Sequence, residues 1–137
     1  MLALTQRSTL IMRGLVFCLL LSVTVQGADQ TYIISDGQSL KDGLDIFEEF
    51  QGGTRRVTWE ETVRASTAVT YAQAFAKACY LWQHETPNQA PFHLPSPLMA
   101  DQFAKIAQKY LKEHPDRLHE KAEFLLLDAI VGAFPRK

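Results

Sequence analysis

The stretch LMADQFAKIAQKYLKEHPDRLHEKAEFLLLDAIVGAFPRK, residues 98–137, contains two apolar repeats of helical spacing with a proline between them. Apolar residues recur every three or four positions before the proline (Phe103, Ile106, Tyr110) and after it (Leu118, Ala122, Leu125, Leu126, Ala129, Ile130, Ala133). Pro115 ends the first helix because the residue before a proline avoids the helical backbone region, and the same proline can begin the next helix. The stretch therefore predicts two helices that fold back on one another at His114-Pro115. The helix before Pro115 is predicted to carry Gln108 on its solvent-facing side, together with Lys105, Lys109 and Lys112.

Two further helices are predicted upstream of this stretch. The first covers about residues 38–50 and ends at the glycine pair 52–53. Thr58 and Glu61 form a capping box that begins a second helix, which no Gly or Pro interrupts from Trp59 to His84. Its predicted buried stripe is Trp59, Val63, Thr67, Thr70, Ala74, Ala78 and Leu81, with Tyr71, Phe75 and Trp82 beside it.

Residues 86–97 hold four of the six prolines and are predicted to form a stiff loop, followed by a helix that begins with Ser96 and Pro97. Strands and helices do not alternate along the chain. The fold class predicted from these patterns is all-α, a small bundle of four to five helices after an N-terminal signal peptide.

The N-terminal segment has the pattern of a secretory leader. It contains Arg7 and Arg13, no acidic residue, an apolar run over 15–21 and a small-residue exit at Gly27-Ala28. The run is shorter than the roughly 20 residues of a membrane span. We therefore expect a signal peptide over 1–27, a periplasmic domain over 28–137 and no stable membrane span after cleavage. That domain keeps one cysteine, Cys79, so an internal disulfide is not expected.

The charge balance indicates which partners to expect. The chain has 14 Lys and Arg against 15 Asp and Glu, and removal of the leader takes away two of the arginines. Nucleic-acid binding requires a basic surface that neutralises phosphates. We therefore expect no nucleic acid as a partner.

Residues that carry chemistry show no pattern typical of an enzyme. The four histidines lack the spacing of a zinc site, and Cys79 lies inside a predicted helix without a histidine near it in sequence. Neighbouring acids such as Glu60 and Glu61 do not face one another on a helix. We predict no catalytic residues, no metal and no cofactor, and a protein that is not an enzyme.

The proline-rich loop contains the residues predicted to contact a partner. Phe92 lies between prolines, where a pre-ordered aromatic ring can anchor a partner at a small entropic cost. Packing of Phe92 in the core is the alternative interpretation. The predicted partner-binding residues are Asn88, Gln89, Phe92 and His93.

A resemblance to a known family is carried by residues 92–135. The matching residues are Phe92 and Pro95, Gln102, Tyr110-Leu111, His114-Pro115, Leu118-His119, Ala122, Ala129 and Ala133-Phe134-Pro135, with a weaker match over 68–74. Their order and spacing resemble the Rap1a/Tai family of small exported immunity proteins against type VI secretion effectors. The resemblance implies binding to a peptidoglycan amidase and occlusion of its catalytic cleft, with the loop over 86–97 as the covering element. Family members commonly carry cysteines where this chain has Ala68, His93 and Arg136.

Three functions remain open at this stage. The first is an exported binding protein of the immunity type, whose partner is a toxin or a cell-wall amidase. The second is a periplasmic structural or assembly factor on the same helical scaffold, with a homodimer as one form. The third is a small hydrolase, which would require a pocket of converging polar groups.

Overall fold

A computed structural model describes residues 32–53, 55–95 and 100–136. It contains four α-helices, α2 (Gly37–Gln51), α3 (Trp59–Glu85), α4 (Ala100–Glu113) and α5 (Ala122–Ala133), and a short 3-10 helix η1 (Pro115–Arg117). No strand forms within these ranges, so the predicted all-α bundle is confirmed. The predicted leader over 1–27, its cleavage site and the Ser96-Pro97 helix start lie outside the described residues.

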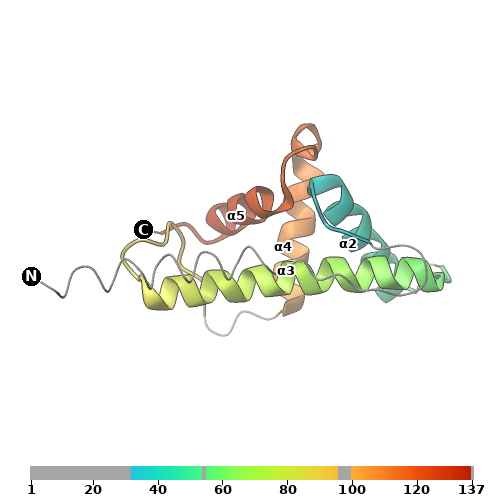
Figure 1. Cartoon of the computed structure of the whole chain (residues 1–137), viewed down its shortest axis with the longest axis horizontal. Helices are drawn as coiled ribbons and strands as arrows, with labels where there is room; N and C mark the ends of the chain where they lie inside the picture. Colours follow the sequence, from blue (N-terminus) through green and yellow to red (C-terminus); the bar gives the residue numbers. More distant parts are fainter. Residues whose placement is uncertain (1–31, 54, 96–99, 137) are drawn as a thin grey trace, which may run out of the picture.

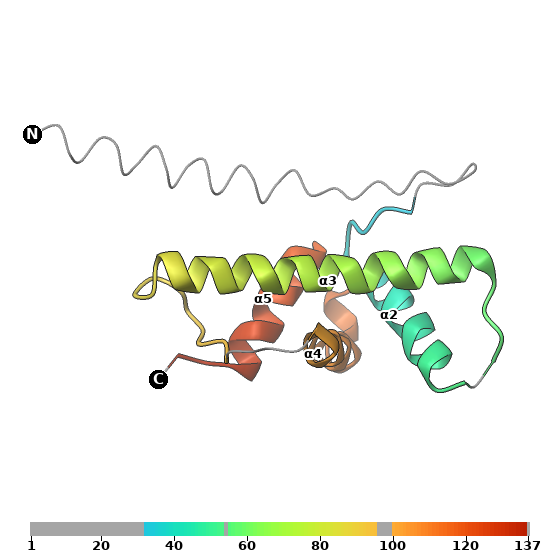
Figure 2. The ribbon, with the colours of Figure 1, turned by 90° about the horizontal axis from the view of Figure 1, so that it is seen from below.

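Helix α3 forms one layer of the molecule, and the other helices form the second. Figure 2 shows α3 running across the molecule with α2, α4 and α5 all on one side of it, and α4 seen end-on while α3 lies across the view. The buried core lies between these layers and includes Leu40, Leu44, Phe103, Leu111, Leu125, Leu126 and Ile130. None of the described helices is both long and apolar enough to span a membrane.

The ends of α2 and α3 follow from local side-chain chemistry. Thr58 accepts a hydrogen bond from the Glu61 backbone N–H, and the Glu61 carboxylate accepts one from the Thr58 N–H, so the predicted capping box is confirmed. Asp36 and Ser39 make the same reciprocal pair at the start of α2. The predicted stop of α2 is also confirmed, with Gly53 in the left-handed region at φ 62°.

Small residues allow α2 and α3 to cross closely. A Cβ added at Gly43 would lie 2.4 Å from the Cβ of Ala68 and 2.9 Å from the backbone oxygen of Arg64. Ala68 and Ala72 are fully buried, whereas Trp59 of the predicted buried stripe is 80 % exposed and Thr70 and Leu81 are also exposed. The predicted stripe was therefore wrong in large part. The apolar residues of α3 are spread over all of its faces. The close crossing at Gly43 favours burial of the face that carries the smallest of them.

The helix predicted to run on from Pro115 is divided in the structure. Residues 115–117 form η1, and α5 begins only at Ala122. In the gap, the carbonyl oxygens of Leu118 and Glu120 accept hydrogen bonds from the backbone N–H groups of Gln38 and Gly37, at 2.9 Å each. The continuous helix was therefore a wrong prediction, because these carbonyls bind the first N–H groups of α2, which no bond within α2 can satisfy.

Gln108 was predicted on the outer face of α4 and is instead buried, with 8 % of its surface exposed. Its Nε2 donates to Asp45 Oδ1 at 2.9 Å and to Glu48 Oε2 at 2.8 Å. Lys112 pairs with the same Glu48 oxygen at 2.7 Å. The prediction failed because helical periodicity places a glutamine in water by default, whereas these acceptors on α2 give its amide partners inside the protein.

Candidate partner-binding surface

The predicted partner loop leaves the C-terminal end of α3 and returns to the second layer. In Figure 1 it lies at the end of the molecule where the chain also terminates, beside the C-terminal residues. Tyr80, His84, Pro87, His93 and Arg136 are among the residues lining a hollow of about 410 Å³ there. We call the hollow, together with the exposed residues of segment 86–95, the loop surface.

Gln83 fastens the far end of the loop to α3. Its Nε2 donates to the Leu94 carbonyl oxygen at 3.2 Å, and its Oε1 accepts from the Leu94 N–H at 2.6 Å. Both polar atoms of the amide therefore bind the backbone of the same residue. This two-way contact fixes the path of the loop relative to the helix that precedes it.

The C-terminal segment fastens the loop from the other side. Phe92 and Pro135 form an antiparallel bridge, in which the His93 N–H donates to the Phe134 carbonyl at 2.9 Å. The side chain of Arg136 extends these contacts to the start of the loop, where Nη1 donates to the Pro87 carbonyl at 2.6 Å. The helix before the loop and the C-terminal segment thus both hold the loop in place.

The four predicted partner residues divide into two groups. Asn88, Gln89 and His93 are exposed on the loop, where a partner can reach them. Phe92 is 1 % exposed, and Trp82 packs against it edge to face with ring centroids 5.5 Å apart. Phe92 therefore packs in the core, which was one of the two interpretations left open. Partner binding by the other three stays a prediction.

Three exposed apolar residues beside the loop were not predicted as part of a site. Tyr80, Leu81 and Trp82, in the last turns of α3, are 39 %, 57 % and 40 % exposed. The sequence placed Leu81 and Trp82 in buried stripes. Length was the available signal, because α3 has 27 residues and the helices that cover it have 12 to 15, so no single one of them can cover α3 from end to end.

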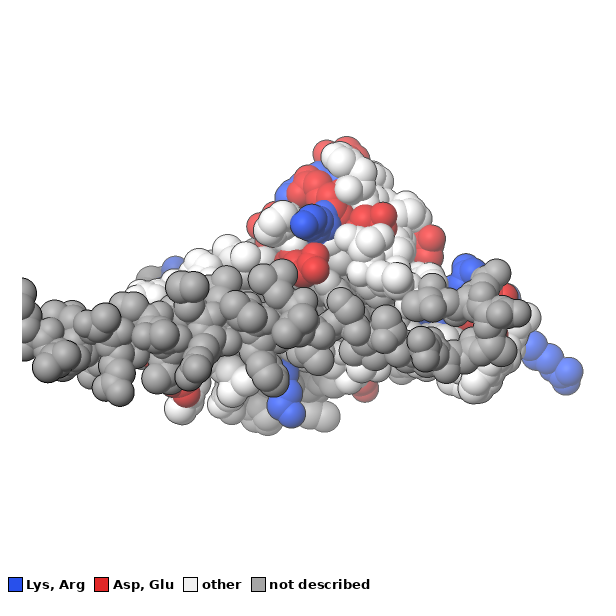
Figure 3. Space-filling model, in the orientation of Figure 1, with Lys and Arg blue, Asp and Glu red and all other residues white. Residues whose placement is uncertain are grey.

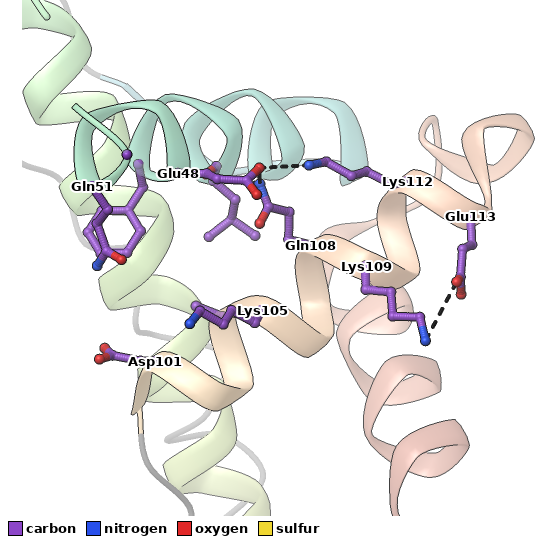
Figure 4. Close-up of a pocket in the computed structure, with 12 residues that line it drawn as sticks. Glu48, Gln51, Asp101, Lys105, Gln108, Lys109, Lys112 and Glu113 are labelled. Carbon is purple, nitrogen blue, oxygen red and sulfur yellow. Dashed lines mark hydrogen bonds and ion pairs between the residues drawn. The ribbon is translucent and has the colours of Figure 1, made fainter. Parts of the chain in front are cut away.

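A second hollow of about 600 Å³ lies between α2 and α4 and is shown in Figure 4. Leu44 and Ala104 line its apolar floor, and charged residues of both signs surround its mouth. Hydrogen bonding to the Lys112 ammonium holds the pKa of Glu48 below its usual range. Because Lys112 pairs with Glu48 and Lys109 pairs with Glu113, these four charges already have partners within the chain.

The residues considered for chemistry have structural surroundings. The His114 ring stacks on Tyr110 with centroids 4.1 Å apart, and its Nδ1 lies 2.9 Å from the Tyr110 carbonyl, which can only accept a hydrogen bond. Cys79 is buried in α3. In the part of the chain that the structure describes, no three His, Cys, Asp or Glu side chains are grouped to hold a metal ion.

The surface charge of the described residues is mixed in sign. On the face seen in Figure 3, Lys and Arg side chains lie among Asp and Glu side chains over the part formed by α2, η1 and α4. Among the described residues visible on this face, basic side chains therefore form no extended surface of the kind that binds phosphates.

Comparison with protein families identifies the chain. The family model of the Rap1a immunity proteins matches residues 53–135, which include α3, the loop, α4 and α5. The chain belongs to the Rap1a immunity protein family. The comparisons with curated proteins and with solved structures find no match. The match confirms the resemblance seen over 92–135 and extends it to the whole of α3. Rap1a immunity proteins are inhibitors rather than enzymes, and membership of the family implies a protein partner, the effector.

Two positions that carry cysteines in relatives, according to the resemblance, lie on neighbouring segments in this Rap1a protein. Phe92 and Pro135 form the antiparallel bridge, and His93 and Arg136 are the residues that follow them on the two segments. The Arg136 N–H donates to the Pro91 carbonyl at 3.4 Å. Here backbone hydrogen bonds and the Arg136 side chain hold the two segments together.

Proposed function

We propose that this Rap1a protein neutralises a peptidoglycan amidase delivered by type VI secretion, and that the loop surface covers the catalytic cleft of the enzyme. One observation carries the proposal: the exposed loop is fixed at both ends and lies beside exposed Tyr80, Leu81 and Trp82. Exposed aromatic side chains next to a rigid polar loop are typical of protein-binding sites.

Preorganisation of the loop supports occlusion as the mechanism. A loop that is ordered before binding loses little conformational entropy when it enters a cleft, so more of the contact energy appears as affinity. Gln83 fixes Leu94 and Arg136 fixes Pro87, so both ends of the exposed segment are already in place. An inhibitor of this kind needs no chemistry of its own, because it acts by excluding the substrate.

The site of action follows from the substrate of such an enzyme. Peptidoglycan lies outside the cytoplasm, so an inhibitor of an amidase that has been delivered there must be exported. The leader pattern over 1–27 supports export. We propose the periplasm as the location, with cleavage after Gly27.

Affinity capture with the purified protein tests the proposal. The bait is presented to candidate amidase effectors from the same genome, and amidase activity is measured on peptidoglycan before and after binding. We expect one stoichiometric partner whose activity is lost. A bait carrying Gln89→Ala and His93→Ala should bind more weakly while its melting temperature is unchanged, and Arg56→Gln at the opposite end of α3 is the control. An effector that binds this bait and the wild-type bait equally would exclude the substituted residues as contacts.

A second function is favoured by other exposed apolar residues. Trp59 is the most exposed of them, and Phe50 and Phe124 are also exposed, all outside the loop surface. These residues suit a periplasmic structural or assembly factor, acting as a homodimer or with an envelope protein. Measurement of the mass in solution by light scattering, together with recovery of an envelope protein instead of an amidase, would support this second function.

A further inference from the structure

Among the described residues, the oxygens that bind the Arg136 side chain are all neutral. Its Nη1 donates to the carbonyl oxygens of Pro87 at 2.6 Å and Ala90 at 3.3 Å, and its Nη2 donates to the side-chain oxygen of Asn88 at 3.4 Å. None of these acceptors carries a charge. The guanidinium is thus fixed in position while its positive charge is left uncompensated by them.

Counting donors shows which edge of the guanidinium remains. Arginine has five N–H groups in a planar fork. The contacts with Pro87, Ala90 and Asn88 use three of them, both on Nη1 and one on Nη2. Nε–H and the second Nη2–H remain. A guanidinium binds a carboxylate through two N–H groups, and two N–H groups of Arg136 remain for such an acceptor.

The hollow beside Arg136 has the charge that an anion requires. Its ionisable lining consists of Tyr80, His84, His93 and Arg136, and no carboxylate is among the described residues that line it. Glu85 is the neighbouring acid in sequence, and its Oε1 lies 3.6 Å from Nδ1 of His84. Among the described residues, the ion pairs of the chain do not include Arg136.

Arg55 provides a useful contrast. It is also exposed and also lies in a loop, but its Nε donates to Glu49 at 2.8 Å and its Nη atoms bind both oxygens of Glu61 at 2.9 and 3.1 Å. Its fork is already occupied by carboxylates of the same chain. Arg136 is held instead by the uncharged oxygens of Pro87, Ala90 and Asn88.

We propose that Arg136 is a carboxylate receptor on the loop surface and that the protein partner inserts an Asp or Glu side chain into the hollow beside it. The proposal rests on the proposed function, since it names the chemistry by which the loop surface recognises the inhibited enzyme. Tyr80 lines the same hollow, and its exposed ring gives the flanking residues of that partner segment an apolar contact. The fixed fork suits this task because little side-chain entropy remains to be lost on binding.

A titration with acetate tests the receptor without any knowledge of the partner. The Nε–H signals of the arginines in the ¹⁵N-labelled protein are followed by NMR as sodium acetate is added, with sodium chloride at equal ionic strength as the control. The Arg136 signal should shift saturably with acetate and much less with chloride, and the Arg55 signal should stay in place. Equal shifts with both salts, or none with either, would overturn the proposal.

A binding experiment with the captured effector tests the biological use of the receptor. Arg136→Gln should weaken binding about tenfold or more, because a charged hydrogen-bonded contact is lost. It should also reduce the salt dependence of the affinity. Arg136→Lys keeps the charge without the planar fork, so its affinity should lie between those of the wild type and Arg136→Gln. Arg56→Gln should bind as tightly as the wild type, although it removes the same charge.

The two experiments separate the possible failures. If Arg136 only holds the loop, Arg136→Gln will lower the affinity and the melting temperature together, the salt dependence will be unchanged and acetate will have no effect. That result would refute the receptor. If no effector binds the wild-type protein, the proposed function fails, and the acetate titration still decides whether the hollow takes a carboxylate.

Discussion

Substitution of Gly43 by alanine should reveal how closely α2 and α3 cross. The new methyl group would stand 2.4 Å from the Cβ of Ala68 and 2.9 Å from the backbone oxygen of Arg64. Carbon atoms in contact prefer about 3.5–4.0 Å, so the two helices must separate by roughly 1 Å at this point. Neither neighbouring atom can rotate away, because one is a Cβ and the other belongs to the backbone.

The expected size of the effect is a balance of two terms. Overpacking a core costs about 1–3 kcal/mol of the free energy of unfolding. Replacement of glycine by alanine inside a helix returns up to about 1 kcal/mol. We expect a net loss of about 1–2 kcal/mol for Gly43→Ala, which lowers the melting temperature by about 5–10 °C in a domain of this size.

Gly132 supplies the matched control. It lies in α5, and a Cβ added there would meet no atom within 4 Å. Gly132→Ala therefore keeps the helix-propensity gain without the collision, and the melting temperature should stay the same or rise. Thermal unfolding followed by circular dichroism measures both variants. A Gly43→Ala protein as stable as the Gly132→Ala protein would refute the close crossing.

Three further predictions concern pH, a buried amide and the thiol. Hydrogen bonds from Arg55 lower the pKa of Glu61 from 4.5 to about 2. The stabilising effect of the Glu61 carboxylate is therefore complete above about pH 4.5 and is lost as the pH falls toward 2. The free energy of unfolding measured with urea should fall more over this interval for the wild type than for Glu61→Gln. Gln108→Leu removes the hydrogen bond to Asp45 and should lower the free energy of unfolding by about 1–3 kcal/mol, seen as a lower urea midpoint; an unchanged midpoint would show that the contact adds no stability. Reductant should leave the melting temperature unchanged, because Cys79 is a buried thiol; a large decrease would indicate a Cys79-linked dimer.

Features set by neighbouring residues were the ones that the sequence predicted well. The capping box of Thr58 and Glu61, the stop at Gly52 and the break before Pro115 each depend on atoms a few positions apart. Such patterns act through the backbone geometry of single residues, and the rest of the fold changes them little. The number and order of the helices followed from these signals.

Features set by packing between distant segments were predicted poorly. The buried face of α3 depends on Gly43 of another helix, and the burial of Gln108 depends on acceptors that α2 supplies. The loop was located correctly from its prolines, but the role of Arg136 depends on its hydrogen bond with the Pro87 carbonyl, 49 residues away in sequence. A local pattern contains no information about such a meeting, so a single sequence gave no sign of it.

The hydrogen bonds between the start of α2 and the segment before α5 have a consequence for the order of folding. The N–H groups of Gly37 and Gln38 bind the carbonyls of Glu120 and Leu118, which are synthesised after α2, α3 and α4. A nascent chain that lacks this segment leaves the amino end of its first described helix without these partners. Contacts between such distant positions form late, because a long loop must close before they are gained. The bundle should therefore assemble in one cooperative step only after this segment has been made, and chains truncated before Leu118 should be degraded rapidly.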